Sequence, residues 1–268
     1  MGGSDTIFAG LIPAIYDRYM VPLVFRPYAK VTAAKAATLK PRRILETAAG
    51  TGVLTEALHR IIPDADIVAT DLNPPMLEQA ARRVNAPNVR FEHADALDLP
   101  FAAESFDLVA CQFGIMFFPD KVKGNSEAIR VLRPGGSYLL TIWNTVDLNL
   151  ATKVAGRAVA DLFPENAAAF YERVPFRYFD KAQIERDLRA AGFDDVEIET
   201  VELRSRAATA RDGAIALTQG TPMRSEIEKA GPDALAAATD AAESALRQFE
   251  GPEGFDAPMS AHIVTATK

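Results

Sequence analysis

Between residues 41 and 144 the chain alternates short apolar runs with amphipathic stretches, and this alternation is its clearest pattern. The short runs predict strands at 43–47, 66–70, 89–93, 106–111 and 136–143. The stretches between them repeat apolar residues at helical spacing. Strands that alternate with helices predict a parallel sheet covered by helices on both faces, with right-handed crossovers.

The segments on either side of this region are predicted to be mostly helical. Residues 1–40 favour helices at 7–20 and 26–39, interrupted near Pro22 and Pro27 because proline has no N–H to donate. We therefore expect N-terminal helices at 1–40 that close over the site and an α/β core at 41–144. A helical cap should follow at 145–258, with one core strand near 196–203, and a C-terminal core strand at 259–268.

One alanine-rich segment of the expected cap, 233–249, has a thin apolar stripe. Leu235, Ala242, Leu246 and Phe249 share a face of the predicted helix. The pattern fits a surface helix and also fits a part of a cap over a substrate, and the sequence leaves both interpretations open.

Composition narrows the class of protein. The chain has 268 residues, 49% hydrophobic and 24% charged, with a formal net charge of -7. This acidity disfavours a nucleic-acid partner. Cys111 is the single cysteine, which excludes an internal disulfide and favours a reducing, cytoplasmic location. No apolar stretch is long enough for stable membrane insertion. The three histidines have no metal-ligand spacing, so we expect no metal.

The first predicted strand leads into a turn of small residues. The strand ends near Glu46, the turn covers Ala48 to Gly52, and a helical pattern follows. Such a turn lets a ligand approach the main chain and leaves helix N–H groups to meet it, although it can also be a packing turn without a ligand. Asp71 ends the second strand about twenty-five residues after Glu46, near the spacing at which an acid meets a ribose. Asn73 is expected to cap the next helix.

Several motifs occur together in one order. They are Glu46-Thr-Ala-Ala-Gly-Thr-Gly52, Asp71, His93-Ala-Asp95-Ala96, Ser105-Phe-Asp107-Leu-Val and Val131-Leu-Arg-Pro-Gly-Gly136. As a set they resemble class I S-adenosylmethionine-dependent methyltransferases, and most of all the small-molecule branch with the ubiquinone and menaquinone biosynthesis enzymes. The resemblance covers residues 40–145. It implies a Rossmann-like, doubly wound, mostly parallel seven-stranded sheet with a helical cap, and S-adenosylmethionine as cofactor.

The chain departs from the family at one position of the turn. Ala48 stands where the family usually has the first glycine of the turn. Alanine disfavours only the backbone region with positive φ, and its methyl group is small. We therefore expect the cofactor to bind despite this departure.

The resemblance also implies how the cofactor is held. Main-chain groups of the turn would line the methionine part and the ribose, Glu46 would lie near the methionine amino group, and Asp71 would accept both ribose hydroxyls. The remaining expected contacts are Leu72 and Met76 against adenine, Asp95 and Ala96 at its polar edge, Gln112 and Phe113 at the methionine end, and Tyr16 and Tyr19 closing from the N-terminal helix. The turn residues concerned are Ala48, Ala49, Gly50 and Gly52. Asp95 could instead be a helix cap or turn residue.

The acceptor side carries no comparable motif. Met116 and Phe117, after the fourth strand, and Trp143 and Asn144, at the end of the fifth, are candidates to line the substrate, although core packing should claim some of these aromatic and Met side chains. Asp107 begins the fourth strand, so we interpret it as structural. Arg133 to Gly136 should be a turn that leads into the fifth strand.

The function expected from this resemblance is in-line transfer of a methyl group to a small organic acceptor. We assign no catalytic residue, because a general base is needed only if the acceptor arrives protonated. An NAD(P)-dependent oxidoreductase is an alternative, although the turn lacks the full G-x-G-x-x-G pattern. A catalytically inactive cofactor-binding scaffold is another. The acceptor, the atom methylated and the oligomeric state are open.

Overall fold

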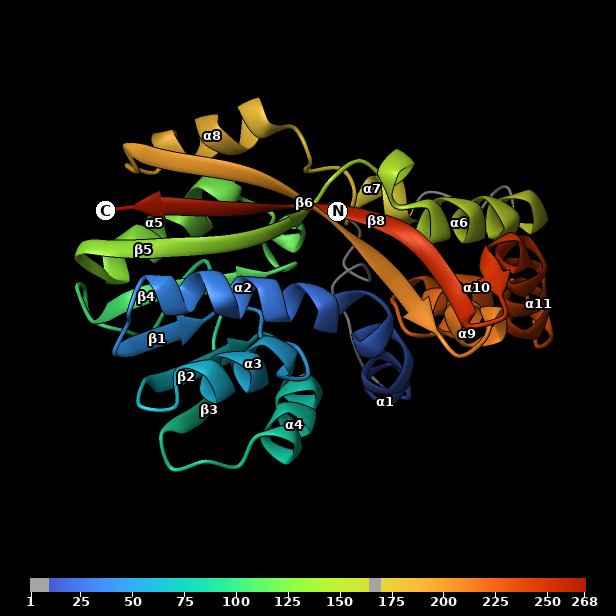
Figure 1. Cartoon of the computed structure of the whole chain (residues 1–268), viewed down its shortest axis with the longest axis horizontal. Helices are drawn as coiled ribbons and strands as arrows, with labels where there is room; N and C mark the ends of the chain where they lie inside the picture. The colour runs from blue at the N-terminus through green and yellow to red at the C-terminus, as the bar shows by residue number, and fades with distance from the viewer. Residues whose placement is uncertain (1–9, 164–169) are drawn as a thin grey trace. The chain divides into compact units, whose positions relative to one another are not determined.

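The computed structural model describes residues 10–163 and 170–268 (Figure 1). The chain forms two compact units. Unit 1 takes residues Met1–Pro27, Asn144–Arg177 and Glu202–Ser260, and unit 2 takes Tyr28–Trp143, Tyr178–Val201 and Ala261–Lys268. Each unit therefore gathers three stretches that are far apart in the sequence. The helix expected at 7–20 is only partly covered, since residues 7–9 lie outside the described residues.

The sheet confirms the predicted α/β class. Its strand order is β3-β2-β1-β4-β5-β8-β6, with the short β7 paired to β8 off this path. Neighbours among β1 to β5 are parallel, and β8 is antiparallel to β5. The strands are β1 Arg43–Glu46, β2 Asp66–Asp71, β3 Val89–His93, β4 Phe106–Gln112, β5 Leu132–Trp143, β6 Asp195–Ala207, β7 Glu250–Gly251 and β8 Gly254–Thr267.

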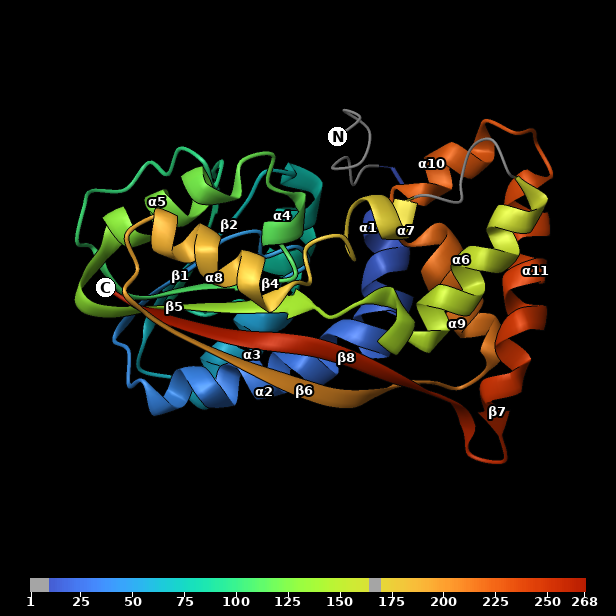
Figure 2. The same ribbon diagram turned by 90° about the horizontal axis from the view of Figure 1, so that it is seen from above.

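The order of the strands reverses between β1 and β4. The chain runs outward from β1 to β3 and then returns to pair β4 with the other side of β1. Right-handed crossovers in opposite directions place the connecting helices on opposite faces, and Figure 2 shows α5 and α8 on one face of this part of the sheet and α2 and α3 on the other. Ligands of such sheets bind at the carboxyl ends of the strands beside the reversal point, which here are the ends of β1, β2 and β4.

The helices of unit 2 connect these strands. They are α2 Arg26–Thr38, whose first two residues belong to unit 1, α3 Val53–Ile61, α4 Pro74–Arg83, α5 Lys121–Val131 and α8 Lys181–Ala190, with the 3₁₀ turn η2 Ile115–Phe117. Asn73 occupies the N-cap position of α4 and Pro74 follows it, as expected, but the Asn73 side chain makes no capping hydrogen bond. Its amide donates to Asp71 instead, at 3.2 Å.

Three strand boundaries differ from the sequence predictions. Arg133 to Gly136 is not a separate turn, because β5 already begins at Leu132; the segment contains a register irregularity opposite 106–108 and Gly135 has φ +77°. Gly135 N and Gly136 O bond with Lys268, so β8 extends the pairing to this segment. β6 and β8 are longer than expected. On β6, which is an edge strand, exposed charged residues alternate with less exposed ones. Charged side chains on an edge strand disfavour pairing with another chain.

Unit 1 is mainly helical. Its elements are α1 Ile12–Ile15, the π-helix η1 Tyr16–Phe25, α6 Leu150–Leu162, α7 Phe170–Arg173, α9 Ala210–Gln219, α10 Met223–Glu228 and α11 Ala234–Leu246, with 3₁₀ turns η3 Val146–Leu148 and η4 Arg247–Phe249. The expected interruption near Pro22 and Pro27 is wrong, because Pro22 lies inside η1 and Pro27 inside α2. In a π-helix the N–H of residue i bonds to the carbonyl group of residue i−5. Pro22 therefore does not meet the carbonyl group of residue i−4, with which a proline ring clashes in an α-helix.

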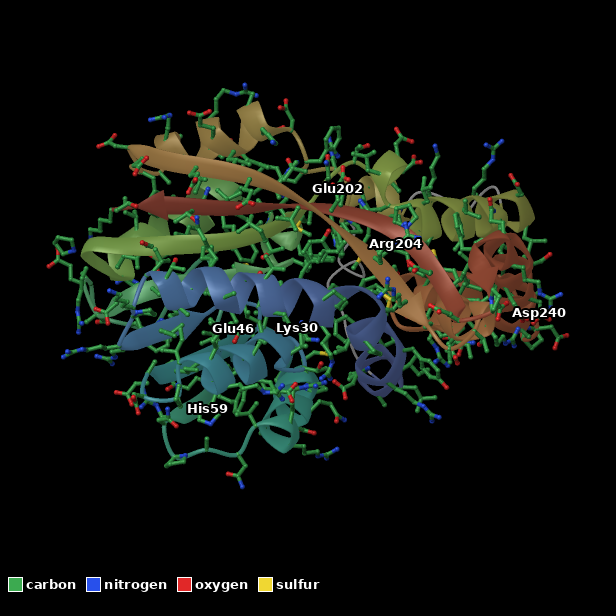
Figure 3. The ribbon with its side chains drawn as sticks, viewed as in Figure 1. Lys30, Glu46, His59, Glu202, Arg204 and Asp240 are labelled. Carbon is green, nitrogen blue, oxygen red and sulfur yellow. The ribbon has the colours of Figure 1, made fainter. Side chains whose placement is uncertain are left out.

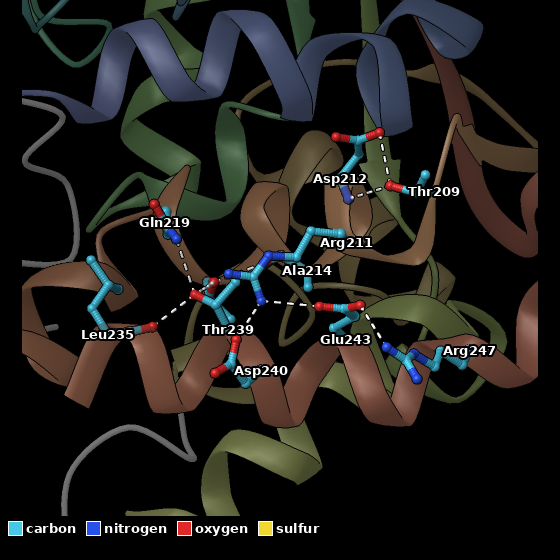
Figure 4. Close-up of polar contacts among 11 residues, drawn as sticks. Thr209, Arg211, Asp212, Ala214, Gln219, Leu235, Thr239, Asp240, Glu243 and Arg247 are labelled. Carbon is cyan, nitrogen blue, oxygen red and sulfur yellow. Dashed lines mark hydrogen bonds and ion pairs between the residues drawn. The ribbon is translucent and has the colours of Figure 1, made fainter. Parts of the chain in front are cut away.

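Helix α11 buries one face within unit 1 and leaves the opposite face exposed. Its buried positions include Ala234, Ala238, Ala242 and Leu246, so the stripe begins one residue before the expected Leu235, and Phe249 falls in η4. Small side chains on this face allow α9 to pack closely. Between the two helices, Thr218 and Thr239 share a hydrogen bond of 3.0 Å. Figure 4 shows Arg211 of α9 paired with Asp240 and Glu243 of α11. Within the described residues, no helix has the length and apolar character required to span a bilayer.

Candidate functional site

The turn after β1 is held between the two neighbouring strands. Thr47 N donates to Ala110 O of β4, and Ala49 N donates to Thr70 O of β2, both at 2.9 Å. Gly50 and Gly52 adopt positive φ values of 56° and 77°. At Gly52 an added Cβ would lie 2.9 Å from the Cβ of Ala80, so this glycine is required by the close packing of the turn on α4.

The structure places Ala48 in the same left-handed region, with φ +53°. The expectation that alanine avoids positive φ is therefore wrong at this position, and the backbone follows the conformation that glycine would adopt more readily. The methyl group of Ala48 faces Gly114, where an added Cβ would come within 2.4 Å of it and within 2.8 Å of Cys111 Sγ. Gly114 thus provides the room that the alanine needs.

Asp71 joins the tip of β2 to this turn. Its Oδ2 accepts from Gly50 N at 2.9 Å, and its Oδ1 accepts from Asn73 N at 2.8 Å. Burial raises the pKa of Asp71 above its ordinary value, and the donors from Asn73 and Gly50 oppose that rise. A carboxylate has about four acceptor positions, so these main-chain donors orient the group and leave capacity for a ligand hydroxyl.

Glu46 is a buried acid at the tip of β1 (Figure 3). Its Oε2 accepts from Thr55 Oγ1 of α3 at 2.6 Å. Burial raises the pKa of Glu46 to about 8; the Thr55 hydrogen bond opposes this, and the charge of Asp71 adds to it. Among the residues that the structure describes, Glu46 has no ion-pair partner, so it is suited to a cationic ligand group.

The tip of β3 contributes the next predicted residues. Asp95 is exposed and its Oδ1 accepts from Leu97 N at 2.9 Å, so Asp95 is a turn residue in this structure whatever else it binds. Ala96 is partly exposed within the same turn. Of the two expected adenine neighbours, Leu72 is 52% exposed and Met76 only 3%. Leu72 therefore presents an apolar surface beside Asp71, while Met76 is buried in the core.

An aromatic cluster lies where β4 and β5 end. The rings of Phe113 and Trp143 stack with centroids 3.8 Å apart, and Tyr28 of α2 meets both rings edge-on. Phe113 has φ +56°, and its N–H donates to Thr141 O at 2.8 Å. A bulky residue in the left-handed region is strained, and such strain is concentrated at ligand sites. Gln112, the last residue of β4, is partly exposed.

The expected acceptor side divides into buried and accessible residues. Met116 is buried, and Phe117 keeps intermediate exposure. Asn144 belongs to unit 1, where its side-chain Nδ2 donates to Ser260 Oγ at 3.1 Å and its side-chain Oδ1 accepts from Thr145 N. Tyr16 and Tyr19 also belong to unit 1; Tyr16 stacks on Phe25 at 5.0 Å, and Arg18 lies over the Tyr19 ring. Their predicted roles stay predictions.

Other reactive residue types do not form a second site in unit 2. Burial raises the pKa of Cys111 to about 11, which makes its thiol inert. Asp107 accepts from Arg42 N and Arg43 N and pairs with Arg133, so it fastens the start of β4. No group of three potential metal ligands occurs in the described ranges 10–163 and 170–268.

Sequence reasoning missed two residues that shape the site. Thr55 hydrogen-bonds Glu46, and Lys121 of α5 donates to Met116 O and Phe118 O. The first could have been found from its place one turn into the helix after the acid. The second has no sequence signal, because a lysine at the start of a helix is ordinary on a protein surface.

The residues at these strand tips fit S-adenosylmethionine. A buried acid without a cation suits the amino group, an oriented carboxylate suits ribose hydroxyls, and exposed Leu72 suits an apolar ring. The positive-φ turn brings main-chain groups to the same edge of the sheet.

Comparisons with known proteins agree with this chemistry. The family described as "Methyltransferase domain" matches residues 44–136. A demethylmenaquinone methyltransferase of Deinococcus radiodurans is 38% identical over 138 residues, which cover 50% of this chain and 57% of that protein. A demethylmenaquinone methyltransferase of Clavibacter sepedonicus is 36% identical over 176 residues, which cover 62% of this chain and 71% of that protein.

Solved structures share the fold. A crystal structure of a putative methyltransferase from Bacillus halodurans has a TM-score of 0.56 at 19% identity, covering 89% of this chain and 98% of the other. Phosphoethanolamine N-methyltransferase 2 of Haemonchus contortus, in complex with S-adenosyl-L-methionine, has a TM-score of 0.54 at 22% identity, covering 89% of this chain and 52% of the other. The 36% identity to the Clavibacter protein, over 71% of its length, shows that the chain belongs to the class I S-adenosylmethionine-dependent methyltransferases.

Proposed function

We propose that the protein transfers a methyl group in line from S-adenosylmethionine to a small organic acceptor, and that the acceptor is a reduced quinone ring. The observation that carries the proposal is the pair of buried acids at adjacent strand tips, Glu46 and Asp71, joined to a positive-φ turn. The relatives named demethylmenaquinone methyltransferases support the acceptor class. Because the alignment covers 57% and 71% of those two proteins, the acceptor is inferred from part of their length.

The geometry of unit 2 supports the following roles for the cofactor residues. Glu46 would hold the amino group, Asp71 the ribose hydroxyls, and Leu72 one face of adenine. Asp95 and Ala96 would take the polar edge of adenine, and Gln112 and Phe113 the methionine end. The turn residues Ala48, Ala49 and Gly50 would offer main-chain groups, while Gly52 supports the turn through α4.

S-adenosylmethionine, when bound, supplies an electrophilic methyl group. The chain's own residues then have to orient the acceptor and exclude water, and positioning of this kind can lower a barrier by roughly 7–11 kcal/mol. Phe113 and Trp143 form an apolar wall suited to a planar ring. Methylation of a quinol releases a proton, and a phenolic hydroxyl with a pKa of about 10 arrives protonated near pH 7. Transfer therefore needs a proton acceptor, which we do not assign to a residue.

Two experiments test the proposal. Isothermal titration should show micromolar binding of S-adenosylmethionine and of its demethylated product, and no heat with NAD. Incubation with methyl-labelled cofactor and a 1,4-naphthoquinol without a ring methyl group should transfer the label. Cofactor binding without transfer to any quinol would contradict the acceptor and leave the inactive-scaffold alternative. Binding of NAD alone would contradict the function. The cytoplasmic location stays a prediction.

A further inference from the structure

The turn η2, Ile115–Phe117, lies between β4 and α5, and the side chain of Lys121 holds it from outside. Within the turn, Phe117 N donates to Gly114 O at 2.9 Å and Phe118 N donates to Ile115 O at 3.1 Å. Lys121 Nζ donates to two further carbonyl groups, Met116 O at 3.2 Å and Phe118 O at 2.8 Å. The ammonium group therefore spans the turn and fixes its main chain at two points.

The position of Lys121 is not explained by helix stability. Lys121 is the first residue of α5, where the helix dipole disfavours a positive charge by about 0.3–1 kcal/mol. Asp120, the N-cap residue, accepts from Lys123 N. The Lys121 ammonium also lies 5.4 Å from the ring centroid of Tyr178, whose hydroxyl donates to Asp187 at 2.9 Å. The carbonyl groups and this ring compensate the cation and hold it in place.

The packing of the turn leaves one side chain distinct from its neighbours. Ile115, Met116 and Phe118 are buried, whereas Phe117 keeps intermediate exposure. The Phe118 ring packs directly on the main chain of α5, because an added Cβ at Gly124 would lie 2.6 Å from its Cδ2. With Phe118 anchored and the carbonyl groups on either side of Phe117 bound to Lys121, the direction of the Phe117 side chain is set.

We propose that Lys121 is a positioning residue for methyl transfer, because its ammonium group holds the turn 115–117 in the conformation that presents Phe117 to the acceptor ring. This inference rests on the proposed function for the existence of an acceptor. It adds that Phe117 contacts the acceptor and that Lys121 acts only through it.

The test compares Lys121→Met, Lys121→Arg and the matched control Lys123→Met on the same helix, in the full chain. Hydrogen exchange of the Phe117 and Phe118 amides should accelerate about tenfold or more in Lys121→Met, because both amides close the turn. Lys121→Arg keeps the charge and the donors and should restore most of the protection, and Lys123→Met should match the wild type. The affinity for S-adenosylhomocysteine should change less than twofold in all three.

Steady-state kinetics with the 1,4-naphthoquinol separate positioning from a structural role. Lys121→Met and Phe117→Ala should each raise the KM for the quinol about fivefold or more with a smaller change in kcat. The double variant should be no worse than Phe117→Ala, because both changes remove one interaction. Additive losses, or unchanged exchange in Lys121→Met, would overturn the inference; so would faster exchange with an unchanged KM. A failure of the proposed function appears elsewhere, as a wild-type protein that binds cofactor and methylates no quinol.

Discussion

Two loops at the carboxyl edge of the sheet in unit 2 invite comparison: the turn from Thr47 to Gly52 and the loop from Phe113 to Phe118. Each follows a parallel strand, and each holds a non-glycine residue in the left-handed region, Ala48 with φ +53° and Phe113 with φ +56°. Both therefore carry backbone strain where a ligand is expected.

The loops differ in what holds them. The first is held by main-chain hydrogen bonds to β2 and β4 and by the carboxylate of Asp71. The second is held by a main-chain hydrogen bond from Phe113 N to Thr141 O of β5, by ring stacking on Trp143 and by Lys121. Polar groups at fixed spacing specify the cofactor half of the site, while packing specifies the acceptor half. The cofactor half of the site can therefore be shared across a family, whereas the acceptor half can change with the acceptor.

The largest expected effect is on the free energy of unfolding and comes from Glu46, the buried acid that precedes the first loop. The pKa of Glu46 is raised from 4.5 to about 8, so the folded protein binds this proton more tightly than the unfolded chain does. The contribution to stability is therefore complete below pH 4.5 and is lost as the pH rises to about 8. At roughly 1.4 kcal/mol for each pH unit, the loss is about 5 kcal/mol.

Urea unfolding at pH 6 and pH 8.5 measures the part of this loss that falls between pH 6 and 8, about 3 kcal/mol. Glu46→Gln keeps an acceptor for Thr55 but cannot titrate, so its stability should fall less than that of the wild type over this range. Binding of S-adenosylmethionine should tighten as the pH rises toward 8 and should release a proton, seen as binding heat that depends on the buffer. Equal pH dependence in the two proteins would contradict the buried neutral acid.

The next effect belongs to the second loop. Phe113→Ala removes a buried ring that stacks on Trp143 and meets Tyr28, so the free energy of unfolding should fall by about 3 kcal/mol. Trp143 is the only tryptophan, so its fluorescence emission reports the loss of the stack directly. An unchanged emission spectrum would show that the two rings do not stack in solution.

The sequence predicted the first loop far better than the second. Strand alternation and the acid–turn–acid spacing identified the sheet, Glu46 and Asp71, because these features depend on local residue types. The hydrogen bond from Gly50 N to Asp71 was not predicted, since it depends on how two strand ends meet in space. The local bond from Asn73 N, two residues along the chain from Asp71, was not predicted either. Asn73 was expected to cap α4, but its side-chain amide donates to the neighbouring Asp71 instead.

The acceptor side was only partly predictable for a physical reason. Apolar residues from 113 to 118 look alike in sequence, and only packing decides that Met116 is buried while Phe117 keeps some exposure. The same limit affected the stripe of α11, where Ala242 and Leu246 are buried as expected but Ala234 and Ala238 are buried in place of Leu235 and Phe249. The break expected near Pro22 was wrong, because the sequence rule assumes an α-helical register and the chain adopts a π-helical one.

A third effect concerns the link that Asp71 makes between the tip of β2 and the turn after β1. Asp71→Ala removes the acceptor of Gly50 N and Asn73 N as well as the expected ribose contact. Loss of a charge-assisted interaction of about 1.5–3 kcal/mol should weaken S-adenosylmethionine binding by one to two orders of magnitude. Asp71→Asn keeps one acceptor oxygen and should lose less. Calorimetric titration of both variants decides, and an unchanged affinity in Asp71→Ala would refute the assignment.

The smallest effect tests whether strain in the first loop serves the ligand. Ala48→Gly should relieve about 1 kcal/mol of backbone strain at φ +53° and remove only one methyl group. We expect a slightly higher free energy of unfolding and an unchanged affinity for S-adenosylhomocysteine, because the main chain keeps its course. The matched change Gly114→Ala should do the opposite, since its Cβ would lie 2.4 Å from that of Ala48. In the double variant Ala48→Gly, Gly114→Ala, the absent Ala48 methyl should restore part of the loss, with Cys111 Sγ still close. If Gly114→Ala is equally harmful in both backgrounds, the contact with Ala48 does not limit the turn, and the alanine owes its place to the ligand instead.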